Sequence, residues 1–229
     1  MTRPKRLKRL KRLLLPCALL GLVSIPVTAH AESAENAWDG GYKQESTRRS
    51  GFLLGLDLGL ALGNATGYPN EIAKLDDPAY RRNTGFALGS SNRVWFGGAL
   101  TDWFVFGIGL NSIGLKHNGT TLAAGAFLFH VEAYPLFYRG GVFRDLSVFG
   151  DFGAGGATIK GRGREDADGG LMSEVGLGVG YDAVRFWKFS LGPAAEYWHS
   201  FSQTMTVNTF TLEARLTFVG GQKVERASR

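Results

Sequence analysis

The chain is almost without cysteine: its 229 residues contain one, Cys17. This residue lies in an N-terminal apolar stretch that we expect to be removed, so the mature chain is expected to contain no disulfide, thiol nucleophile or thiolate metal site. Lipid attachment to Cys17 is not expected either, because Leu14-Leu15-Pro16 precede it where small residues are needed.

Long apolar runs are also missing. Beyond residue 31 no segment approaches the roughly 18 consecutive apolar residues that a transmembrane helix requires. If this chain crosses a membrane, it must therefore cross it with strands.

Positive charge is scarce outside the N-terminus. The net charge of +6 depends on residues 1–12, which hold seven of the 26 Lys and Arg and no acid. Without them 19 cations face 20 Asp and Glu, a net charge of −1. We therefore expect no nucleic-acid partner.

The N-terminus has the three parts of a secretory signal. A basic region is followed by apolar residues 13–27 and then by Ala29-His30-Ala31, with small residues at the −3 and −1 positions. The alternative, a membrane anchor, fits less well because the stretch is short and is interrupted by Pro16 and Pro26. This pattern predicts a cleaved signal peptide over residues 1–31 and a periplasmic lead-in over residues 32–50.

From residue 51 onward, bulky apolar residues alternate with small or polar ones, which is the pattern of β-strands. Eight such stretches are predicted, over residues 51–63, 84–100, 104–115, 122–136, 146–159, 171–182, 189–199 and 207–218. An even number returns both ends to one side of a barrel. The connections alternate between short and longer, the longest being residues 63–83.

Alternation alone fits two architectures: a soluble barrel or sandwich with leucine inside, or a membrane barrel with leucine in lipid. The second face consists of Gly, Ala and Ser with isolated charges, unlike a solvated face. The lysines after the leader all fall outside the predicted strands, at positions 43, 74, 116, 160, 188 and 223. The 33 glycines suit a narrow bore. We therefore predict that the leucines face lipid.

Aromatic residues cluster at the short connections and predict a girdle at the periplasmic boundary. Its expected members are Trp103, Phe104, Phe106, Phe137, Tyr138, Phe186, Trp187 and Phe218. Tyr197, Trp198 and Phe201 are expected at the opposite rim.

Residues 51–218 resemble the small eight-stranded outer-membrane proteins of the OmpA-barrel, OmpX and OmpW type. The resemblance depends on the alternation, the turn Leu100-Thr101-Asp102-Trp103, and the closing strand from Thr209 to Phe218. It implies an all-β, eight-stranded, antiparallel up-and-down transmembrane barrel, monomeric, in the bacterial outer membrane. In such proteins the barrel-assembly machinery recognises a last strand ending in Phe. Here residues 219–229 follow, and we expect them to form a periplasmic tail.

With the leucines outside, a set of charged residues must point inward, with His130 and Asn111 nearby. They are Asp57, Arg93, Glu132, Asp151, Glu174, Glu196, Glu213 and Arg215. One interpretation is a plug in which Arg93 bridges acids, Asp57 first, and Arg215 with Glu213 completes the network. The other is a narrow pathway for cations or protons, suggested by six acids against two arginines.

Other motifs are weaker. His199, Ser200 and Ser202 do not match the lipid A deacylase pattern, and adjacent strand residues point to opposite faces. Residues 165–169 lack the downstream acid of a calcium loop, and no helix follows the glycines at 153–156. The arginines at 81, 82, 162 and 164 are suited to contact lipopolysaccharide phosphates.

We therefore expect no catalytic residue, metal or cofactor. The predicted role is structural or surface interaction, among outer-membrane lipid and lipopolysaccharide, through the outer loops. The alternative is a narrow channel for small or apolar solutes, and a lipid-modifying enzyme is the less favoured third.

Overall fold

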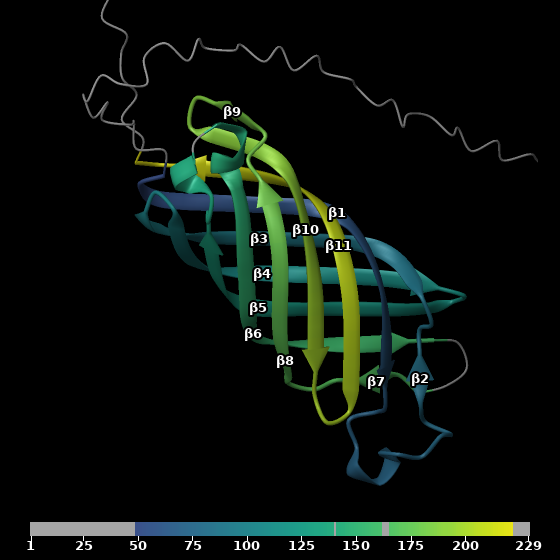
Figure 1. Ribbon diagram of the computed structural model, residues 1–229. Helices are drawn as coiled ribbons and strands as arrows, with labels where there is room; N and C mark the ends of the chain where they lie inside the picture. The colour runs from purple at the N-terminus through teal and green to yellow at the C-terminus, as the bar shows by residue number, and fades with distance from the viewer. Residues whose placement is uncertain (1–48, 140, 162–164, 222–229) are drawn as a thin grey trace, which may run out of the picture. The chain divides into compact units, whose positions relative to one another are not determined.

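The computed structural model describes residues 49–139, 141–161 and 165–221 (Figure 1). It contains eight long strands: β1 (Gly51–Gly67), β3 (Ala87–Thr101), β4 (Phe104–His117), β5 (Thr120–Ala133), β6 (Leu146–Lys160), β8 (Met172–Tyr181), β10 (Phe189–Phe201) and β11 (Met205–Val219). No helix in the described part of the chain is long and apolar enough to span a membrane. The signal peptide predicted over residues 1–31 lies outside the described residues.

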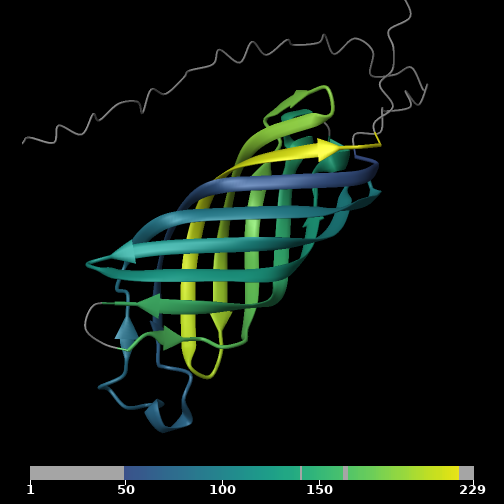
Figure 2. The ribbon, with the colours of Figure 1, turned by 180° about the vertical axis from the view of Figure 1, so that it is seen from behind.

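The long strands form one closed antiparallel barrel. Each pairs with its neighbour in the sequence, and the last pairs with the first from Leu53↔Val219 to Gly67↔Met205. Figures 1 and 2 show this seam, where β11 lies beside β1. The predicted eight-stranded up-and-down barrel is confirmed.

The strand ends differ from the expected ones by a few residues. The strand predicted over residues 122–136 ends at Ala133, because Pro135 has no N–H and restricts the residue before it. Lys116 and Lys160, expected in connections, lie at the C-terminal ends of β4 and β6. The prediction that no strand contains lysine is therefore wrong.

Short elements occupy the two ends. The long connection after β1 holds a 3₁₀ turn (Ile72–Lys74) and β2 (Arg82–Asn83), and the connection after β6 holds β7 (Ala167–Asp168). The other end has two 3₁₀ turns (Phe137–Arg139 and Gly141–Asp145) and β9 (Val184–Phe186). The connections thus alternate between the two ends as predicted.

The leucine face is the outside of the barrel. On β1 the side chains of Leu56 and Leu60 are 40% and 68% exposed, whereas Asp57 between them is fully buried. On β11, Leu212 is 57% exposed. Such a continuous apolar surface is suited to hydrocarbon and not to water. The soluble-core alternative is therefore rejected.

The interior is more apolar than the sequence predicts. Toward the end that carries the long loops the interior is filled by a buried apolar cluster, which we call the outer apolar cluster because it lies nearer those loops. Its large members are Ile113, Leu115, Leu122, Leu128, Ile159, Met172, Trp198, Met205 and Val207. A second cluster near the opposite end contains Leu53, Trp95, Val105, Tyr134, Phe137 and Val219. The charged residues lie between these two layers.

Candidate functional site

The centre of the interior is a row of three charged side chains on adjacent strands. Cross-strand pairing places Asp57 of β1 directly opposite Arg93 of β3 and Arg215 of β11. Arg93 donates from Nε to Asp57 Oδ2 at 2.7 Å, and Arg215 donates from Nε to Asp57 Oδ1 at 3.0 Å. One carboxylate thus accepts from an arginine on either side.

Arg93 extends across the bore to the far wall. Its Nη1 donates to Asp151 Oδ2 of β6 at 2.5 Å and to Glu196 Oε2 of β10 at 2.6 Å. Its Nη2 lies 3.5 Å from Glu213 Oε2 of β11. A single guanidinium on β3 therefore contacts acids of four other strands, and Arg93 is only 2% exposed.

A second branch runs through Arg215 and His130. Arg215 Nη1 donates to Glu132 Oε1 of β5 at 2.7 Å. His130 lies between two acids, with Nδ1 2.8 Å from Asp151 Oδ1 and Nε2 3.6 Å from Glu132 Oε2. Trp95 stacks on the imidazole, with ring centroids 4.5 Å apart. This contact holds the imidazole between its two partners.

An aromatic ring supports both arginines. The guanidinium carbons of Arg93 and Arg215 lie 4.8 and 4.1 Å from the ring centroid of Phe149. The ring has room because Gly178 faces it: a Cβ there would lie 2.3 Å from Phe149 Cζ. Glycine at this position therefore permits the aromatic platform on which the arginines rest.

Seven of the eight predicted interior charges share this network, and Glu174 does not. Glu174 accepts a hydrogen bond from Asn111 Nδ2, one layer closer to the outer apolar cluster. Asn111 in turn accepts from the backbone N of Ala126 at 2.8 Å. His130, predicted only to lie nearby, is a full member of the network.

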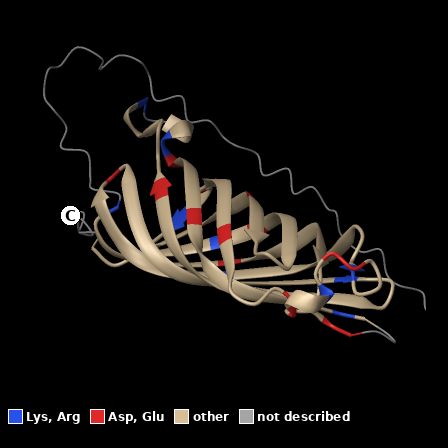
Figure 3. Cartoon of the chain, turned by 90° about the horizontal axis from the view of Figure 1, so that it is seen from below, with Lys and Arg blue, Asp and Glu red and all other residues tan. Residues whose placement is uncertain are grey.

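The network holds five carboxylates against two guanidinium groups and one imidazole, all buried. Figure 3 shows that acidic and basic positions lie close to one another on the strands of the barrel. In a medium of low polarity, buried charges are tolerated only when they are paired. The described residues contain no group of three His, Cys, Asp or Glu placed to hold a metal ion. The arrangement is thus suited to crosslink the wall across the bore.

A second ionic group, which the sequence pattern does not predict, lies at the end of the barrel opposite the long loops. Arg49, just before β1, is 2% exposed. Its Nη2 donates to Asp145 Oδ1 and Asp182 Oδ2, both at 2.9 Å, and its backbone N donates to Asp102 Oδ1 at 2.8 Å. Arg185 binds the same two acids at 3.0 and 2.8 Å. We call these five residues the end cap.

Arg49 also lies over the ring of Tyr134, 3.3 Å from its centroid. Burial lowers the pKa of Arg49, but Tyr134, Asp182 and Asp145 outweigh burial and hold that pKa above its ordinary value. Arg49 falls in the predicted polar lead-in because it precedes the period-two pattern. The only signal for it in the sequence is its position immediately before the first strand.

Most of the predicted girdle residues face outward at the end-cap side. Trp103, Phe106, Tyr138, Phe186 and Trp187 are exposed, and Phe104 and Phe218 are half-buried. Two predictions are wrong. Phe137 is buried in the cluster with Trp95 because its 3₁₀ turn folds over the barrel end, and Trp198 points inward because it shares the parity of Glu196.

His199 faces outward, and its hydrogen-bond partner is a side-chain amide. Its Nδ1 lies 2.9 Å from Asn208 Oδ1, and its ring stacks on Phe201 at 5.3 Å. Ser200 points inward and is buried. The two side chains lie on opposite faces of β10, as the strand period requires.

Comparison with known proteins gives a likeness of fold only. No family model matches the chain, and no curated protein matches its sequence. Neisserial surface protein A (NspA) is similar in structure, with 14% identity, a TM-score of 0.52, and coverage of 75% of this chain and 98% of that one. Ail, the attachment invasion locus protein of Yersinia pestis, gives 13% identity, a TM-score of 0.46, and coverage of 74% and 99%. The chain has the fold of the small eight-stranded outer-membrane barrels.

Proposed function

We propose that this protein is an outer-membrane barrel that does not conduct ions and that presents its outer loops as an interaction surface. On this proposal residues 1–31 direct export and are removed, the leucine wall lies in lipid, and the end cap faces the periplasm. Lipid and lipopolysaccharide surround the barrel, which acts as a monomer without catalytic chemistry.

One observation supports the proposal that the bore is closed to ions. The Arg93 guanidinium lies within 2.7 Å of carboxylate oxygens from three strands on different sides of the interior. The outer apolar cluster lies on one side of it, and the end cap on the other. An ion passing along the bore would have to break these contacts in a medium where unpaired charge is costly.

The outer loops support an interaction role because they are tied together. Lys74 Nζ bonds Glu71 and Glu165 at 2.9 and 2.7 Å, and Arg82 Nε donates to the Glu165 carbonyl at 2.8 Å. The bonds to Glu165 and Glu71 raise the pKa of Lys74 to about 12, so it stays charged at neutral pH. A surface that is ordered in advance loses less entropy on binding.

Conductance in planar lipid bilayers tests the closed bore. We expect the purified full-length barrel to give no current steps at neutral pH. The double variant Arg93→Gln, Asp57→Asn removes the central bonds and should give brief openings, whereas Lys74→Gln in the loops should stay silent. A steady cation current through the unaltered barrel would support the narrow channel instead.

A further inference from the structure

One part of the outer wall differs from the rest. The outward side chains of β3, β4, β5 and β6 form rows in direct cross-strand register. From the outer rim downward the rows are Leu88, Lys116, Thr121, Lys160; then Ser90, Gly114, Ala123, Thr158; then Asn92, Ser112, Gly125, Gly156; then Val94, Leu110, Phe127, Ala154. A basic row therefore lies above two rows of small and polar residues, and a bulky apolar row lies below them.

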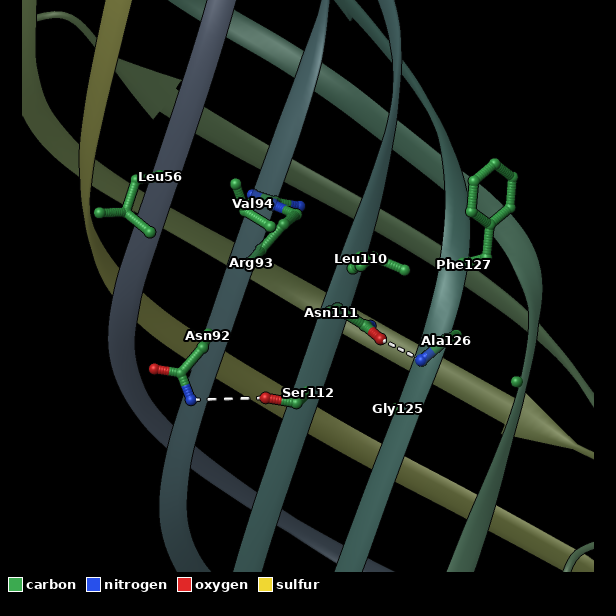
Figure 4. Close-up of a pocket in the computed structure, with 11 residues that line it drawn as sticks. Leu56, Asn92, Arg93, Val94, Leu110, Asn111, Ser112, Gly125, Ala126 and Phe127 are labelled. Carbon is green, nitrogen blue, oxygen red and sulfur yellow. Dashed lines mark hydrogen bonds between the residues drawn. The ribbon is translucent and has the colours of Figure 1, made fainter.

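The lower of the two small rows, with Asn92, Ser112 and Gly125, and the bulky row next to it line a groove. Its volume is about 600 Å³, and its lining includes Leu56, Asn92, Leu110, Ser112, Gly125 and Phe127. In Figure 4 the Asn92 and Ser112 side chains approach each other across β3 and β4, and Gly125 beside them leaves bare backbone. Leu110 and Phe127 form the edge of the groove that is farther from the outer rim. Bulky side chains cover this face lower down, so the groove is a local recess in the wall.

Two lysines lie closer to the outer rim than the recess, and the small row of Ser90, Gly114 and Ala123 lies between them and the recess. Lys116 and Lys160 are exposed, on the outward faces of their strands. Lys116 is on β4 and Lys160 is on β6, so one strand separates them and their backbones are about 10 Å apart. Successive rows are about 7 Å apart along a strand. The opposite wall, where His199, Asn208 and Asn64 lie in one row, carries no lysine among its described outward residues.

We infer that this recess is a binding site for one phosphorylated, acylated glycolipid of the outer leaflet. Lys116 and Lys160 bind its phosphates, Thr121 and Ser90 face the polar headgroup, and acyl chains lie over Gly114, Ala123 and Gly125. Charge complementarity selects an anionic lipid, and the recess accommodates chains that a row of leucines would push outward. This inference depends on the proposed placement of the wall in the outer membrane.

Native mass spectrometry of the full-length barrel in detergent tests the site. The probes are bis-phosphorylated lipid A, its dephosphorylated counterpart and phosphatidylglycerol. We expect one bis-phosphorylated lipid A to be retained in preference to both others. The double variant Lys116→Gln, Lys160→Gln should lower its affinity on the order of tenfold.

Gly114→Leu should also weaken binding, because its bulky side chain would occupy the small row between the two lysines and the recess. A Cβ at Gly114 meets nothing within 4 Å, so the change does not strain the wall. The matched controls are Gly150→Leu, at an outward glycine whose Cβ would make only an ordinary contact at 3.7 Å, and Lys188→Gln at the other end. Both controls should bind as the unaltered barrel does.

Equal binding by all variants, or equal retention of the dephosphorylated lipid, would overturn the site. Stronger retention of phosphatidylglycerol would also overturn it, because the recess would then not select a glycolipid. Two other measurements would show that the proposed function is wrong. These are absence of the protein from the outer-membrane fraction, and an ion current through the unaltered barrel.

Discussion

At the residue scale, strand parity predicts which side chains point inward, but not which of them pair. Asp57 alternates with Leu56 and Leu58, and Arg93 alternates with Val94 and Phe96, so both are predicted to point inward, and the structure places both in the bore. That Arg93 also reaches Asp151 and Glu196 depends on barrel closure and on register across distant strands. Neither can be read from alternation, which is local to each strand.

Glycine at position 178 is expected to control the network without taking part in it. Gly178→Val would force Phe149 away from Arg93 and Arg215, because the new Cβ would lie 2.3 Å from Phe149 Cζ. Overpacking of this kind costs about 1 to 3 kcal/mol. Urea unfolding of the folded barrel in detergent should therefore show a lower midpoint.

Gly114→Ala is the control, since its Cβ enters open space on the outer face. It should leave the midpoint where it is. A Gly178→Val barrel as stable as the unaltered protein would show that the aromatic platform contributes little.

At the scale of elements, the strands were predictable and their ends were less so. Period-two patterning extends through each strand, whereas the last residues depend on pairing with a neighbour. Lys116 and Lys160 are examples: each pairs with Thr121 of β5 and so belongs to a strand. The 3₁₀ turns at the end cap were not predicted, because no regular period marks them.

The residue before β1 is expected to hold the turns of the end cap together. Arg49→Gln removes a cation that binds Asp145 and Asp182 in a buried position. Loss of one partner of a buried charged group costs about 3 to 5 kcal/mol. Hydrogen exchange should therefore become faster at residues 134–145 and 182–190, and the unfolding midpoint should fall.

Arg139→Gln is the matched control, because Arg139 is exposed in the neighbouring turn. Its exchange pattern should follow the unaltered protein. Unchanged exchange in Arg49→Gln would mean that the remaining contacts of the two acids, Arg185 among them, suffice to hold the turns.

At the scale of the whole molecule, the exposed leucines and phenylalanines of the outer wall predict a protein that partitions into a membrane. Full-length protein should separate with outer membranes on a density gradient. It should also resist dodecyl sulfate until it is heated, because the closed wall has no free edge at which unfolding can begin. Gel mobility before and after boiling measures this.

Adding charge to the lipid face gives a sharper version of the same test. Leu58→Arg, at an outward position of β1, should lower the yield of the heat-modifiable form, since arginine in the hydrocarbon costs about 2 to 4 kcal/mol. Asn64→Arg, closer to the rim, should be tolerated. A soluble product with no shift on boiling would contradict the membrane placement.

The seam between β11 and β1 has a consequence for how the chain is connected. Beyond the seam the backbone N–H groups of Gly220 and Gly221 donate to the carbonyls of Phe52 and Ser50, so the two ends of the described wall run side by side. In the folded barrel every long strand is paired on both sides, so neither β1 nor β11 is an edge strand. The position of the chain ends is therefore not fixed by the pairing of the strands. A circular permutant joined through a short linker from 221 to 49 and opened at the tight hairpin tip, Asn118-Gly119, would keep every ladder of the native wall and Arg49 of the end cap, and would place new termini on the far rim.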